Sequence, residues 1–433
     1  MNRKIINKWL LFPLLLISIY GKGQEKELTL SGAIEKALEN NYGVVISRSD
    51  VEVASINNNW GNAGRYPSVG FDASSSNNID KNNTANYTSN RLSGGMNVTW
   101  TLFDGFQVNV TKEKLGQLET LAEGRSDVVI ESTIQDVITG YYQVLLQKEK
   151  LSVLEKVMSL SRDRYDYEQA RHELGGIVTF QVLQAKNNYL DDKAAFMNQE
   201  VSFRNSVRNL NFLMTEEPSI MWSFTDPFEP GEESYQFDAL LEKMLSNNRT
   251  LQNQYISLLL QQSEVKLKRG TLYPSLSLSA GADETYTYQD RAGTDPTSST
   301  SLNSYGNLML SYDIYTGGTR KRAIEVAKIN EEIVQIENEQ MKHSLTNQLM
   351  NVFDYYNVRK ALLEVAEESL QSAELNLQIA DDKFRAGVIN SFNYRDIQLI
   401  YLNSAQRKLE AIYNLIDSRT TLTRLTGGFI SGN

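Results

Sequence analysis

The sequence predicts a mostly α-helical protein with a small β part, built from an internally duplicated chain. Residues 28–76 match residues 235–283 at an offset of 207, and residues from Trp100 onward match at an offset of 212. Four long stretches contain no proline, which is poorly tolerated inside helices. Four shorter stretches alternate apolar and polar residues, which is the period of a strand with one apolar face.

The duplication divides the chain into units of one plan. We expect a signal peptide at 1–23, a first structural repeat at 24–215, a linker at 216–236 and a second repeat at 237–433. Each repeat is predicted to contain a helix, two strands, a very long helix, a short turn with glycine and a returning helix. Matched positions include Asn41 with Asn248, Tyr66 with Tyr273, Gly175 with Gly387, and Leu213 with Leu425.

The first 23 residues have the features of an export signal. Arg3, Lys4 and Lys8 make a basic start, and an apolar run follows from Trp9 to Ile19. A retained membrane anchor is the alternative, but this run is shorter than the roughly 20 residues that a membrane span needs. The sequence therefore predicts export, and no later stretch has the length and apolarity of a membrane helix.

The composition leaves few groups for chemistry. The chain has no cysteine and only two histidines, His172 and His343, which have no second histidine at metal-binding spacing. We expect no catalytic residue, metal or cofactor, and we predict that His172 packs near a turn. Acidic pairs at 191–192 and 381–382 are interpreted as solvated helix faces.

The charge of the exported chain argues against a nucleic-acid partner. The signal holds four of the 43 basic residues and none of the 53 acidic ones, so the rest carries 39 minus 53, or −14. A surface of this sign repels phosphate backbones.

The proline-free stretches are predicted to be helices. They cover 106–172, 177–215, 318–384 and 390–427, and each repeat opens with a further helix at 30–63 or 237–270. The helix over 106–172 has 67 residues, which gives a length of about 100 Å. The two other helices of the first repeat together match that length, so they can run antiparallel beside it.

Both long helices carry apolar residues at heptad spacing, which indicates coiled-coil packing. A second row lies two positions, or about 200° of helix rotation, from the first, so each helix is expected to have neighbours on opposite sides. This favours a wall of helices, flat or closed into a cylinder, and leaves an extended coiled-coil rod open. The first row is Val137, Val144, Leu151, Met158 and Tyr165, repeated as Leu349, Tyr356, Leu363, Leu370 and Leu377; the second includes Leu146, Val153, Val358 and Val365.

The alternating stretches are predicted to be four strands of about ten residues, the length of membrane-barrel strands. A membrane barrel with a wet lumen and a soluble, half-buried sheet would show the same alternation. The stretches 75–91 and 282–301 are expected to be solvated loops. Within a membrane, four strands cannot close a barrel and open edges are not viable, so closure requires a homo-oligomer. A trimer leaves room for a lumen and is favoured over a dimer.

Each second strand is followed at once by a long helix. Gly105 and Gly317 stand at these strand-to-helix joints, where glycine allows the chain to change direction. Trp100 and Tyr312 come just before the joints. Aromatic side chains prefer the interface between membrane and water, so we expect both residues there.

These motifs, in this order, resemble those of the TolC-like outer membrane efflux proteins, also called outer membrane factors. The resemblance covers essentially the whole exported chain. It rests on LTLSGAIEKALENN near the start, RYPSVGF and LYPSLSL before the strand pairs, TLFDGF and DIYTGG after them, and FRAGVINSFNYRDIQ at the second helical turn. It implies a trimer with a 12-stranded outer-membrane β-barrel that continues into a 12-helix periplasmic α-barrel, with the linker 216–236 in an equatorial belt.

The resemblance also implies partners at the tips of the helices, 173–180 and 385–392. There the turns meet a periplasmic adaptor (membrane fusion) protein, which couples the duct to an inner-membrane pump of the RND, ABC or MFS type. The turn residues that correspond in this sequence are Gly175, Gly176, Gly387 and Val388.

Two further features of the family concern gating. Acidic residues three apart on the final helix form charged rings that narrow the entrance, and the matching positions here hold Asn393 and Asp396. Some members latch the tip with a tyrosine and an arginine, but Phe384 and Ile389 occupy those positions. Arg385 or Arg395 is the hypothetical substitute.

Taken together, the residues and the resemblance predict a passive exit duct in the outer membrane of a Gram-negative cell, surrounded by outer-membrane lipid. It would serve a tripartite efflux or type I secretion system and open when the adaptor and the pump dock. The alternative is a secreted coiled-coil scaffold or a periplasmic adaptor without a pore. The sequence leaves the cargo open.

Overall fold

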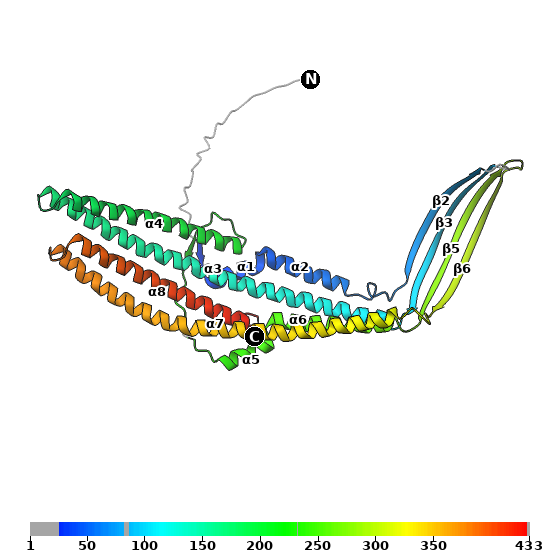
Figure 1. Ribbon diagram of the computed structural model, residues 1–433. Helices are drawn as coiled ribbons and strands as arrows, with labels where there is room; N and C mark the ends of the chain where they lie inside the picture. Colours follow the sequence, from blue (N-terminus) through cyan, green and yellow to red (C-terminus); the bar gives the residue numbers. More distant parts are fainter. Residues whose placement is uncertain (1–25, 82–85, 232, 431–433) are drawn as a thin grey trace, which may run out of the picture.

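The computed structural model describes residues 26–81, 86–231 and 233–430; the expected signal peptide at 1–23 lies outside these ranges. The molecule is elongated: helices run side by side along most of its length, and a four-stranded sheet extends from one end of them (Figure 1). No helix in the described ranges is both long and apolar enough to cross a membrane.

The sheet is antiparallel throughout, with the strand order β2-β3-β5-β6. Its strands are β2 (Ser68–Lys81), β3 (Asn86–Phe103), β5 (Ser275–Arg291) and β6 (Thr297–Ser311). They have 14 to 18 residues, so the expected length was too short, and the predicted loops 75–91 and 282–301 are mostly strand. Alternation stops in these segments because both faces become polar, whereas the backbone pairing continues.

The two faces of the sheet differ in polarity. Pairing places Phe71, Met96 and Ala282 side by side on one face. On the other face it places Asp72, Gly95, Asp283 and Asn303 in one row across all four strands. The alternation in the sequence therefore produces one apolar and one wet face.

The helices form a single layer. The two long helices expected are present as α3 (Gln107–Glu173) and α7 (Thr319–Arg385), with 67 residues each. Far from the sheet, α4 (Thr179–Leu213) packs on α3, α3 on α8 (Ser391–Leu425), and α8 on α7. Near the sheet the order is α2, α3, α6, α7 (Figure 1). The layer therefore has α2 and α4 along one edge and α7 along the other.

The heptad rows show where each long helix lies in this layer. The first row is buried or half-buried in both helices, and Val144 and Leu349 are fully buried. In the second row Leu146 of α3 is buried, but Val358 and Val365 of α7 are 55% and 63% exposed. Within one chain, α3 has helical neighbours on both sides, as predicted. In the described part of the chain, the exposed side of α7 has no helical neighbour.

The opening helix of each repeat is divided, and the prediction of one continuous helix was wrong. Residues 30–63 form α1 (Leu30–Asn40) and α2 (Tyr42–Asn57), and residues 237–270 form α5 (Phe237–Asn247) and α6 (Arg249–Gly270). The side chain of Asn41 caps α2 and donates to the carbonyl of Leu213, while Asn248 caps α6 and donates to that of Leu425. Each asparagine stabilises the new helix start and ties it to the end of the returning helix.

A small parallel sheet at mid-length was not predicted. It pairs β1 (Lys26–Leu28) with β4 (Trp222–Phe224), which lies within the stretch 216–236 that the sequence predicts as a linker. The Tyr141 hydroxyl of α3 donates to the Leu28 carbonyl at 2.9 Å, and the Trp222 indole donates to Asn211 Oδ1 at 2.6 Å. Strands of three residues have too few positions to show a period, so the sequence carries no signal for them.

Candidate functional site

The two helical hairpins end in turns of the same geometry at the end of the molecule opposite the sheet (Figure 1). Gly175 and Gly387 have φ of 77° and 74°, in the left-handed region that favours glycine. The next residues, Gly176 and Val388, donate their backbone N–H to Arg171 and Lys383 carbonyls, both at 2.8 Å. These hydrogen bonds close each helix end in the same way, as expected for duplicated turns.

An ion pair joins the two hairpins close to these turns. Arg395 of α8 donates to both carboxylate oxygens of Asp192 in α4, at 2.6 and 2.7 Å. The Ser161 hydroxyl of α3 donates to the same carboxylate, and Asp192 is only 4% exposed. Removal of one partner from a buried pair typically costs about 3–5 kcal/mol, because the other charge is left unpaired. The pair therefore holds the second hairpin against the first.

Arg164 of α3 is a second buried cation between the hairpins, with 2% exposure. Its Nη1 donates to the Ser391 carbonyl at 3.3 Å and to Gln398 Oε1 at 3.4 Å. Its Nε and Nη2 meet no acceptor in the described part of the chain. Burial, and then the nearby Arg395, lowers the pKa of Arg164 to about 10, so the group stays charged at neutral pH. Because part of the buried Arg164 guanidinium has no hydrogen-bond partner among the described residues, the contact between the hairpins at this residue is weaker than its burial alone would indicate.

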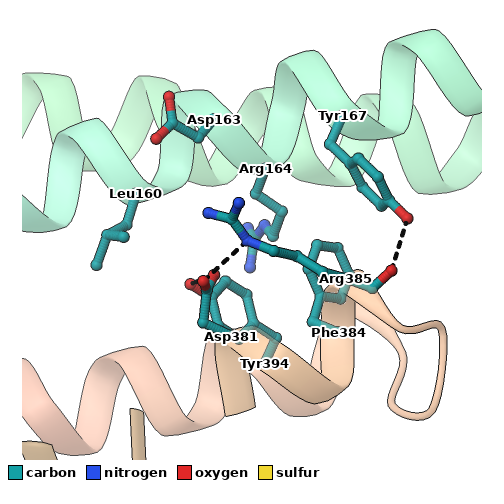
Figure 2. Close-up of a pocket in the computed structure, with 8 residues that line it drawn as sticks. All are labelled: Leu160, Asp163, Arg164, Tyr167, Asp381, Phe384, Arg385 and Tyr394. Atoms are coloured by element: carbon teal, nitrogen blue, oxygen red, sulfur yellow. Dashed lines mark hydrogen bonds and ion pairs between the residues drawn. The ribbon is translucent and has the colours of Figure 1, made fainter. Parts of the chain in front are cut away.

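Aromatic rings fill the space between the hairpins beside Arg164 (Figure 2). The Phe384 ring stacks on Tyr394 at 4.9 Å between centroids, and Tyr167 meets Phe384 edge-on at 5.4 Å. The Tyr394 hydroxyl donates to Asp381 at 3.0 Å, and burial, followed by this bond, raises the pKa of Tyr394. A cavity of about 440 Å³ remains, lined by Leu160, Asp163, Arg164, Tyr167, Asp381, Phe384, Arg385 and Tyr394.

The predicted gate residues stand apart from this cluster. Asn393 and Asp396 are exposed at the start of α8, and the Asn393 backbone N–H takes part in the helix cap at Asn390. Phe384 and Ile389, at the positions of the family latch, pack in an apolar cluster. Of the two hypothetical substitutes, Arg395 bridges the hairpins, whereas Arg385 pairs with Asp381 of its own helix at 2.9 Å.

Of the acidic pairs at 191–192 and 381–382, Asp191 and Asp382 are exposed as predicted, whereas the other two residues have partners that were not expected. Asp192 and Asp381 were expected on solvated helix faces, but Asp192 is buried against Arg395 and Asp381 accepts from Tyr394. His172 lies at the first tip turn, where its Nδ1 is 2.9 Å from the Ile177 carbonyl oxygen. In the described ranges, no cluster of three or more histidine or acidic side chains is placed to hold a metal ion.

The strand-to-helix joints lie at the other end of the helices. Gly105 has a φ of 73°, and a Cβ there would lie 2.2 Å from the Gly270 carbonyl oxygen, so two backbones touch at this point. Gly317 also has positive φ, at 61°, but open space around it. The indole of Trp100 donates to the Arg65 carbonyl at 2.9 Å, and Tyr312 is 57% exposed.

Comparison with known proteins decides the family. A sequence model of the outer membrane efflux protein family matches residues 33–216 and 240–428. The chain belongs to this family. Among characterised members, it is 22% identical to the outer membrane efflux protein BepC of Brucella suis biovar 1 over 413 residues, which covers 91% of this chain and 86% of BepC.

Solved structures of outer membrane channels have the same fold. The CmeC outer membrane channel of Campylobacter jejuni superposes with a TM-score of 0.74 at 16% identity, over 92% of this chain and 85% of CmeC. The open state of the MtrE outer membrane channel of Neisseria gonorrhoeae gives a TM-score of 0.71 at 15% identity, over 92% and 89%. The mostly helical fold with a small β part is therefore that of TolC-like outer membrane channels, as predicted.

Proposed function

We propose that this member of the efflux family is the passive exit duct of a tripartite efflux system in the outer membrane of a Gram-negative cell. Three copies close into one tube, with a β-barrel in the membrane and a helical barrel in the periplasm. A periplasmic adaptor and an inner-membrane pump of the RND, ABC or MFS type complete the system. In the alternative form of this proposal, the same duct serves a type I secretion system.

The observation that carries this proposal is the pair of open edges on the molecule. One edge presents β2, α2 and α4, and the other presents β6 and α7. Both helical edges expose apolar rows at heptad spacing: Leu183, Leu190 and Met197 on α4, and Val358, Val365 and Ile379 on α7. Edges that differ along their whole length suit head-to-tail contacts, which generate a closed ring when the rotation between copies closes.

Ring closure also solves the problem of the strand edges. In one chain β2 and β6 each leave a row of backbone groups without strand partners. Such edges are not viable in lipid, and pairing β6 of one copy with β2 of the next removes them. Three copies supply twelve strands, which enclose a lumen lined by the wet face, while the apolar face meets lipid.

The tip turns are the proposed docking surface for the adaptor. Gly175, Gly176, Gly387 and Val388 shape them, and large apolar side chains are left exposed there, among them Leu174 at 88% and Phe392 at 67%. Docking would compete with the contacts between the hairpins, above all the pair of Arg395 with Asp192. Binding energy at the tip, without chemistry in this chain, would then open the duct.

Cell fractionation tests the proposed function. The expected result is an outer-membrane protein that migrates as a trimer in an unheated denaturing gel and as a monomer after heating. A soluble periplasmic monomer would contradict the duct and would support the alternative of a coiled-coil scaffold or an adaptor without a pore.

A further inference from the structure

The joints between strands and helices carry a surplus of positive charge in an otherwise acidic chain. The end of α6 contributes Lys266, Lys268 and Arg269, and the first turn of α7 contributes Arg320, Lys321 and Arg322, whereas the whole chain has a net charge of −10. The first turn of α7 has no acidic residue, although the helix dipole favours acidic groups there. Two of them have partners just before this turn: Arg320 pairs with Asp313, and Arg322 donates to the Gly317 carbonyl at 2.9 Å.

Three of these cations, Lys266, Arg269 and Lys321, together with Arg65, form what we call the basic collar. Arg65 lies on the side of the apolar sheet face. Its carbonyl accepts from the Trp100 indole, and Trp100 shares a cross-strand row with Leu278 and Leu308. A cavity of about 310 Å³ at the joint is lined by Arg65, Trp100 and Leu102, together with Phe106 from the turn into α3.

The other members of the collar share one face of the layer formed by α6 and α7. The Phe106 ring contacts Tyr273 at 6.1 Å, just beyond α6. Lys266 and Arg269 follow Tyr255 by 11 and 14 residues and therefore share its face of α6. Lys342 of α7 lies over the Tyr255 ring at 5.7 Å, and Lys321 is three heptads before Lys342. Lys266, Arg269 and Lys321 therefore share one face of the α6–α7 pair, at the end of these helices that lies next to the sheet.

Part of this charge has no internal partner. Lys266 pairs with Glu113 at 2.9 Å, and the Arg65 guanidinium stacks on the Trp60 ring at 4.5 Å. Arg269 and Lys321 are exposed, and neither pairs with a carboxylate in the described part of the protein. Exposed cations without partners beside an apolar, aromatic surface are available to an anion that also has an apolar body.

We propose that the basic collar binds the phosphate groups of anionic glycerophospholipids in the membrane leaflet nearest the helices. The inference rests on the proposed insertion of the sheet in a membrane and names its lipid partner. Guanidinium and ammonium groups bind phosphate through charge-assisted hydrogen bonds. Trp100, Phe106 and Tyr312 supply the aromatic surface typical of the headgroup level. Each basic residue near an anionic lipid surface strengthens binding about fivefold.

Native mass spectrometry of the full-length trimer, titrated with phosphatidylglycerol or phosphatidylcholine, tests the collar. The wild type should bind phosphatidylglycerol more tightly. The double variant Arg269→Gln with Lys321→Gln should lose roughly 25-fold in phosphatidylglycerol affinity, with phosphatidylcholine binding unchanged. The double variant Lys148→Gln with Arg407→Gln removes the same charges from exposed sites on α3 and α8, and it should bind like the wild type.

Further experiments distinguish a loss of lipid binding from a folding defect and from the binding of other anions. The exchange Arg269→Lys with Lys321→Arg keeps the charge and should retain wild-type affinity. Equal binding of both lipids, an unchanged affinity in the collar variant, or displacement of phosphatidylglycerol by inorganic phosphate at the same concentration would overturn the inference alone. A soluble monomer on fractionation would overturn the proposed function together with the inference.

Discussion

At the scale of single residues, Asp192 provides the clearest test of how the hairpins are held together. Asp192→Asn removes the charge that pairs with Arg395 but keeps an oxygen that can accept from Ser161. We expect the duct to spend more time open, with a several-fold higher mean conductance in a planar bilayer. Asp166→Asn is the control, because Asp166 is exposed and pairs with Arg162 of its own helix at 3.9 Å. Equal conductance of the two variants would contradict the role of the ion pair.

Asp396 tests the predicted ring at the entrance. Three copies of this exposed carboxylate near one axis would attract cations and repel anions. Asp396→Ala is expected to lower the preference for cations, measured as a shift of the reversal potential toward zero in a salt gradient. Asp382→Ala removes an exposed charge of the same sign from α7 and should leave the potential unchanged. An unchanged potential in Asp396→Ala would show that the ring does not select ions.

Glu131 makes the stability of the helical layer depend on pH. It is 4% exposed on α3, where Arg249 of α6, Arg424 of α8 and Asp127 of its own helix act on it. Burial raises the pKa of Glu131 from 4.5 to about 7. Below pH 4.5 folded and unfolded chains both hold the proton; as the pH rises toward 7 only the folded chain holds it, so the unfolding free energy falls.

The variant Glu131→Gln removes this dependence. Relative to the variant, the wild type should lose on the order of 3 kcal/mol of unfolding free energy between acidic and slightly alkaline pH. Thermal melts in detergent should therefore agree near pH 4.5 and separate at pH 8, with the variant more stable. A constant difference between the two proteins across this range would mean that Glu131 does not titrate there.

Residues of the tip differ in how well the sequence predicts them. Gly175 and Gly387 were predictable because a left-handed turn between two proline-free helices needs glycine, and the duplication shows the requirement twice. Asp192 was not predictable, because its partner Arg395 is 203 residues away and an acid on a polar helix face has no local sign of burial. The two hairpins had to be placed side by side before the pair became visible.

At the scale of elements, the wet face of the sheet depends on close cross-strand pairs. Gly95 is paired with Asp283, and a Cβ on Gly95 would lie 2.8 Å from the Ala282 carbonyl oxygen, a backbone atom that cannot move freely. Gly95→Ala should therefore lower the yield of heat-modifiable trimer and its melting temperature. Gly306→Ala, in the neighbouring pair of strands, has open space and should behave like the wild type. Equal melting temperatures would show that the strands tolerate the extra carbon.

Some elements of this fold can be predicted from the sequence and others cannot. The 67-residue helices α3 and α7 show themselves by the absence of proline and by sustained heptads. No helix-breaking residue marks the division of the opening helices at Asn41 and Asn248. An asparagine can cap a helix or lie within one, so the sequence alone does not predict the division. Only the contacts of these side chains with the ends of α4 and α8 decide between the two.

At the scale of the whole molecule, the duplication produces a layer with unlike edges. The two heptad rows predicted neighbours on both sides of each long helix. They did not indicate that α3 would find both neighbours in its own chain while α7 lacks one, since the order of helices depends on long-range packing. The exposed apolar rows of α4 and α7 are the positions that lack a neighbour within the described chain, and contacts between copies in a ring would cover them.

Conductance of the purified protein in a planar lipid bilayer shows whether copies of this chain enclose a pore. The expected result is discrete current steps of uniform size, carried by a species that migrates as a trimer before heating. A trimer that inserts into the bilayer but passes no current, in the wild type and in Asp192→Asn alike, would contradict the duct.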